Sequence, residues 1–142
     1  MSARPRLAPP SGQPPPRAAR LADGTALDLE TLAADVCARY RAEFPDEEER
    51  YGEAGDLWCR HDNQHLINWA ALHTQGYVVL DEQVAWLAKV LEAREFPLDR
   101  LARDLDITAE VVRARVPSDA GGPVAEALSA AAAMVRSRPT FL

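Results

Sequence analysis

The sequence predicts an all-α protein, a bundle of five or six helices that follows a disordered N-terminal tail. Two observations predict this class. From about residue 28 onward, apolar residues recur every three or four positions, which is the spacing of one helix face. The first twenty residues instead hold six prolines and almost no large apolar side chains. We therefore expect a tail over 1–24 and a single helical domain over 25–138.

The tail is rich in proline and arginine. Such a segment cannot bury enough apolar surface to offset the entropy lost on ordering, so it is expected to be disordered with polyproline II character. Two roles are open for it. It is either a solubilising leader or a docking segment for a proline-binding groove or an acidic partner.

The composition indicates a cytoplasmic protein. The 142 residues carry a net charge of -6, no apolar run approaches the length that spans a bilayer, and the N-terminus lacks the hydrophobic stretch of a secretory signal. Lys89 is the only lysine among 16 basic residues, and alanine is abundant, which is typical of a GC-rich bacterial genome. Because the body of the chain is acidic, nucleic-acid binding would need a local basic face.

Two cysteines, Cys37 and Cys59, lie within apolar helical patterns. In a reducing compartment we expect both to be small core residues rather than a disulfide.

The predicted helices follow one another along the chain. The first covers 29–44, capped by Asp28 and ended by Pro45. The second, expected to be central, runs over 56–75, and Gly76 closes it in the left-handed conformation. The remaining helices are predicted over 82–95, 97–105, 108–116 and 124–138.

The segment 98–116 has the pattern of two helices joined by a tight turn. A small residue, a turn residue, a branched residue, a capping threonine and a second branched residue follow in order, as Ala102, Asp106, Ile107, Thr108 and Val112. This helix-turn-helix-like pair resembles that of helix-turn-helix regulators over about 20 residues. The resemblance implies a partner-binding surface formed by Arg100, Arg103, Thr108, Arg113 and Arg115.

The partner of this surface is left open by its charge. Four arginines and four acids lie between residues 97 and 117. A protein partner is therefore at least as well supported as DNA.

A second pattern lies on the central helix, where Trp58, Asp62, His65 and Trp69 share one face. Asp62 could hold the imidazole of His65 for acid–base chemistry, or the two could form a hydrogen bond within the core. The tryptophans either belong to the core or cover a ligand pocket. A metal site is a further alternative, with ligands from Cys59, His61, His65 and His73.

A third pattern overlaps the second. Arg60 is followed by His65 as Arg-x4-His, with a polar residue directly after the arginine, which is similar to the motif of HEPN ribonucleases. The resemblance implies that Arg60 and His65 hold the scissile phosphate of RNA across a dimer interface.

The sequence lacks a phosphate-binding glycine loop, a nucleophile elbow and a cysteine framework for zinc. The leading hypothesis is a small bacterial regulatory or adaptor protein that binds a macromolecule, protein or DNA, through 98–116. The alternative is a helical protein whose Asp62 and His65 form a site that binds a metal or small ligand or performs acid–base chemistry. A homodimer is compatible with either.

Overall fold

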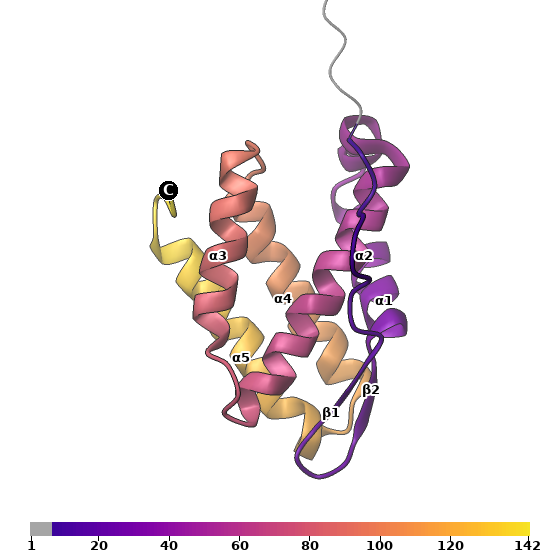
Figure 1. Cartoon of the computed structure of the whole chain (residues 1–142), viewed down its shortest axis with the longest axis vertical. Helices are drawn as coiled ribbons and strands as arrows, with labels where there is room; N and C mark the ends of the chain where they lie inside the picture. The colour runs from indigo at the N-terminus through magenta and orange to yellow at the C-terminus, as the bar shows by residue number, and fades with distance from the viewer. Residues whose placement is uncertain (1–6) are drawn as a thin grey trace, which may run out of the picture.

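The computed structural model describes residues 7–142 and is mostly helical, as predicted (Figure 1). A two-stranded hairpin precedes five helices in the described part of the chain. The elements are β1 (Ala18–Arg20), β2 (Ala26–Asp28), α1 (Leu29–Glu43), α2 (Asp46–Thr74), α3 (Leu80–Ala93), α4 (Leu98–Arg115) and α5 (Ser118–Ser137).

All five helices contribute to one apolar core. The largest fully buried side chains include Leu29 of α1, Leu66 of α2, Leu105 of α4 and Leu128 of α5. Helices α2 and α3 meet at the loop that joins them and diverge toward their other ends (Figure 1). This divergence positions the site described below.

The ends of α1 and α2 follow local sequence signals. Asp28 caps α1, because its Oδ1 accepts a hydrogen bond from the backbone N–H of Thr31 at 3.1 Å. Helix α1 ends at Glu43, before Pro45, as predicted. At the other end of α2, Gly76 has φ 81°, and its N–H donates to the carbonyl of His73. These three predictions are confirmed.

Helix α2 starts ten residues earlier than predicted. The acidic segment at 46–51 is already helical, and the chain then kinks at Gly52, which has φ 62° and ψ -154°. Only glycine adopts this conformation readily. Asp56, at the predicted start of the helix, lies within it.

Residues 7–24 differ from the disordered tail that was predicted, whereas residues 1–6 lie outside the described part. Strand β1 pairs with β2 in an antiparallel register, with Ala19 opposite Leu27. Residues 7–17, here called the strap, run along α2. Two side chains of α2 donate hydrogen bonds to backbone carbonyls of the strap, Trp58 to Ala8 and Gln64 to Pro16. Gln75, the residue that follows α2, donates to the carbonyl of Arg20 in β1. The prediction considered only buried apolar area, whereas these polar contacts also order the segment.

The helix-turn-helix-like pair is not confirmed, because Leu98–Arg115 forms one continuous helix. Thr108, the predicted cap, is fully buried within it and donates to the carbonyl of Asp104 at 2.7 Å. Asp106, the predicted turn residue, accepts a hydrogen bond at 2.6 Å from Arg136 of α5. Burial of both Ile107 and Val111 favours an uninterrupted helix over a turn at this point.

A left-handed residue ends α3, and it is not glycine. Glu95 has φ 63°, a conformation that costs about 1 kcal/mol or more for a residue with a Cβ atom. We expect Glu95→Gly to raise the free energy of unfolding by about 0.5–1 kcal/mol in urea denaturation. Ala93→Gly, at the last helical position of α3, should lower it instead. Equal destabilisation by both variants would contradict this prediction.

Candidate functional site

A cleft of about 590 Å³ opens between α2, α3 and the first half of α4. Its walls are mostly apolar, and its volume is in the range of pockets that hold drug-sized molecules. Helix α2 contributes Trp58, Asp62, His65 and Trp69 to it, and α3 contributes Trp86 and Val90. Tyr40, Leu101 and Asp104 are buried side chains at its base. The strap reaches its edge through Leu7 and Ser11.

Four rings follow one another along the α2 wall. The ring centroids of Trp58 and His61 are 5.2 Å apart, those of His61 and His65 are 4.9 Å apart, and those of His65 and Trp69 are 5.5 Å apart. Their spacing of three or four residues places them on one helix face. We call these four residues the aromatic ladder. Trp86 lines the opposite wall and is 59% exposed, so all three tryptophans of the chain line the cleft.

Asp62 bonds to a different histidine from the one expected. Its Oδ1 lies 3.2 Å from Nδ1 of His61, so the predicted Asp62–His65 pair is not formed. Burial is the main factor that lowers the pKa of His65, and the neighbouring His61 adds to it, whereas Asp62 acts in the opposite direction. His65 is therefore neutral at physiological pH and contributes a flat, half-buried ring.

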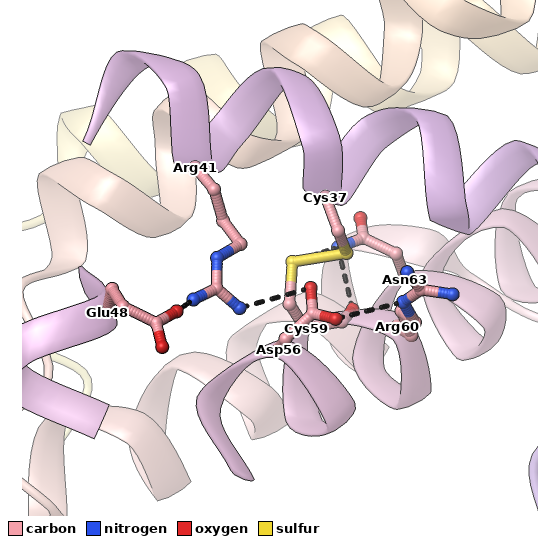
Figure 2. A network of polar contacts seen from close by, with 7 residues as sticks. All are labelled: Cys37, Arg41, Glu48, Asp56, Cys59, Arg60 and Asn63. Atoms are coloured by element: carbon pink, nitrogen blue, oxygen red, sulfur yellow. Dashed lines mark hydrogen bonds and ion pairs between the residues drawn. A yellow bond between two sulfur atoms is a disulfide. The ribbon is translucent and has the colours of Figure 1, made fainter. Parts of the chain in front are cut away.

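The predicted metal ligands are not brought together. Cys59 forms a disulfide with Cys37, whose Cα atom lies 6.0 Å away, so Cys59 offers no thiolate to a metal (Figure 2). His73 lies at the far end of α2, where its Nδ1 accepts a hydrogen bond from the N–H of Leu80 at 3.1 Å. Within residues 7–142, no group of three or more His, Cys, Asp or Glu residues is placed to hold a metal ion.

The disulfide also corrects the expectation that the two cysteines are separate core residues. The two cysteines are 22 positions apart in the sequence, and they face each other because α1 and α2 pack side by side. Helical periodicity places each cysteine on a face of its own helix but does not show which face of another helix it meets.

Arg60 and His65 point to different parts of the molecule. Arg60 is exposed, and its Nε pairs with Asp56 at 3.2 Å in the network drawn in Figure 2. Arg41 also contacts Asp56 in this network, at 3.4 Å. His65 instead lines the cleft. Residues five apart on a helix lie on different faces, so the structure does not bring the ribonuclease-like pair together.

Most of the partner-binding residues predicted on α4 make contacts within the chain. Arg100 pairs with Asp46 at 3.0 Å, Arg103 with Glu43 at 2.7 Å, and Arg115 with Asp35 at 2.8 Å, while Thr108 is buried. Arg113 is exposed, and no ion pair is found for it within residues 7–142. The arginines therefore tie α4 to α1 and to the start of α2.

A buried polar cluster that the sequence analysis missed lies at the base of the cleft. Asn63, only 1% exposed, donates from Nδ2 to Oδ1 of Asp104 at 3.1 Å. The hydroxyl of Thr108 lies 2.9 Å from Oδ1 of Asn63. Asp104 and Thr108 are four residues apart on the apolar stripe of α4, and polar residues on a buried stripe are the signal that could have revealed this cluster.

Asp104 has the most perturbed carboxyl group of the cleft. Burial raises its pKa to about 7, although the hydrogen bond from Asn63 acts to lower it and the nearby Asp62 raises it further. At neutral pH the native protein therefore holds Asp104 as a mixture of carboxylic acid and carboxylate.

Glu47 and Tyr40 form a second polar contact at the base. The hydroxyl of Tyr40 donates to Oε1 of Glu47, and burial together with this bond raises the pKa of Tyr40 above its usual range. Arg100 approaches the same carboxylate oxygen at 3.6 Å. One oxygen of Glu47 is thus held by groups from α1 and α4.

Comparison with protein families, with curated proteins and with solved structures found no match for this chain. Within residues 7–142, none of the helices is long and apolar enough to cross a membrane. The geometry of the cleft is therefore the best indication of what the protein does.

Proposed function

We propose that this protein binds a small, largely apolar molecule in the cleft between α2 and α3. The observation that carries the proposal is the position of the three tryptophans. They line one cleft instead of being buried in the core, and Trp86 leaves more than half of its surface in solvent. Large aromatic rings exposed around a concavity mark a binding site more often than a stable free surface.

The macromolecular partner expected at 98–116 has less support. Three of its arginines bind acidic residues of the same chain, and Thr108 is buried. A regulatory or adaptor role through this surface would require these ion pairs to break. The ligand-binding alternative needs no such rearrangement, because the cleft is already open.

Binding is expected to be measurable with N-phenyl-1-naphthylamine, an uncharged probe whose fluorescence rises in apolar surroundings. The probe should also quench tryptophan emission, because all three tryptophans line the cleft. Val90→Phe places a phenyl ring in the cleft from α3 and should weaken binding about tenfold.

Lys89→Phe is the matched control, because it places the same ring on the neighbouring exposed position of α3. This variant should bind the probe as the wild type does. Circular dichroism and thermal unfolding would verify that both variants fold. The proposal fails if the wild type does not bind the probe, or if the two phenylalanine variants bind it equally well.

A further inference from the structure

The charged groups of the cleft indicate the chemical class of its ligand, an inference that rests on the proposed function. We propose that the ligand is a hydrophobic organic cation. Its positive group lies between Asp62 and Asp104, and its apolar part packs against the aromatic ladder and Trp86.

Two carboxylates of the cleft have spare hydrogen-bonding capacity. Asp62 uses Oδ1 toward His61, and Asp104 uses Oδ1 toward Asn63. Within residues 7–142, no hydrogen-bond partner is found for Oδ2 of either residue. Because an ionised carboxylate only accepts hydrogen bonds, a cation or a hydrogen-bond donor is the complementary ligand group.

The aromatic ladder and Trp86 also favour a positively charged ligand group. The face of an indole ring attracts cations, and the ladder already carries one such contact, with Cζ of Arg94 5.7 Å from the ring centroid of Trp58. Trp69 at the other end of the ladder and Trp86 across the cleft also line the site. Trp86 is 59% exposed, so its indole ring is accessible to an ammonium or amidinium group.

The basic side chains of the cleft offer less to an anion. Arg41 pairs with both Glu48 and Asp56, so its charge is already compensated. Arg94 is exposed at the edge, where it lies over Trp58. Four acids line the cleft against these two arginines: Glu47, Asp56, Asp62 and Asp104.

A bound cation should also change the protonation of Asp104. Its pKa of about 7 in the free protein means that a positive ligand would displace a proton. The other ionisable groups near it are Asp62 and Glu47 of α2, Tyr40 of α1 and Arg100 of α4. His61 and His65 line the same cleft, so their titration must be separated from that of Asp104.

The test is isothermal titration calorimetry of the full chain with three probes that share a naphthalene ring. They are 1-naphthylmethyl-trimethylammonium, 1-naphthalenemethanol and 1-naphthaleneacetate, which are cationic, neutral and anionic. We expect the cation to bind about tenfold more tightly than the alcohol, and the anion to bind most weakly. The affinity for the cation, and not for the alcohol, should rise between pH 6 and pH 8.

Asp104→Asn and Asp62→Asn are the variants that test the two carboxylates. Each should reduce the affinity for the cation toward that for the alcohol. Only Asp104→Asn should abolish the rise of cation affinity with pH. Both histidines remain in this variant, so loss of the rise assigns it to Asp104. Alcohol binding should change much less than cation binding in both variants, and circular dichroism would verify that both fold.

The outcomes separate the two proposals. If the alcohol binds and the cation binds no more tightly, or if the anion binds best, the inference about charge is overturned and the proposed function stands. If none of the three probes binds, both are overturned.

Discussion

Asp104→Asn should make the protein more stable above pH 7 and remove the loss of stability that Asp104 causes as pH rises from 4 to 7. The carboxyl group has a pKa of about 7 in the native state against 3.8 for an exposed aspartate. Between these values the native state keeps a proton that the unfolded chain has released, so the free energy of unfolding falls as pH rises. The full shift corresponds to about 4 kcal/mol, and we expect the variant to recover about half of this or more at pH 8.

The measurement is urea denaturation of wild type and variant at pH 5 and pH 8. The amide oxygen at position 104 can still accept the hydrogen bond from Asn63. The lowered pKa of His65 has the opposite effect, because it reduces the free energy of unfolding as pH falls. This contribution is the same in the wild type and in Asp104→Asn. Asp99→Asn, an exposed change on the same helix, serves as control and should leave the pH profile as it is. Parallel profiles for wild type and Asp104→Asn would contradict the prediction.

Reduction of the disulfide between Cys37 and Cys59 should lower the free energy of unfolding by about 3 kcal/mol. The bond closes a loop over a sequence separation of 22 residues, and releasing it increases the entropy of the unfolded chain. The expected result is a lower urea midpoint when a phosphine reductant is added.

A double variant, Cys37→Ala with Cys59→Ala, is the control for effects of the reductant itself. It should be less stable than the oxidised wild type and insensitive to reductant. A wild-type midpoint that does not change on reduction, with loss of the bond verified by mass spectrometry, would show that α1 and α2 need no covalent link.

Sequence reasoning succeeded where a feature depends on neighbouring residues. The cap at Asp28, the helix end before Pro45 and the left-handed Gly76 all follow from backbone chemistry within a few positions. It failed where two readings are locally equivalent. The pattern around Asp106 fits a turn as well as a helix, and packing of α4 against α5 decides for the helix.

The same distinction applies to the candidate site: residues on one helix could be predicted to lie together, and residues from different helices could not. Periodicity alone places Trp58, Asp62, His65 and Trp69 on one face, and the structure places all four on one wall of the cleft. Trp86 and Asp104 belong to other helices, so their presence in the same cleft depends on tertiary packing that the spacing of residues does not encode. The choice of His61 rather than His65 by Asp62 depends on side-chain rotamers, which lie equally beyond a pattern of positions.

The strap and α2 are joined by hydrogen bonds in which the strap supplies the acceptors and the helix supplies the donors. Proline has no backbone N–H, so a proline-rich segment presents carbonyl oxygens with few donors to match them. Helix α2 supplies donors to the strap from the indole of Trp58 and the side-chain amide of Gln64, and Gln75 just beyond the helix donates to Arg20 of β1. A segment attached in this manner can lie across a helix without belonging to any sheet. The same shortage of N–H groups makes the strap a poor template for a foreign strand, so residues 7–17 are held in place without presenting an edge that favours aggregation.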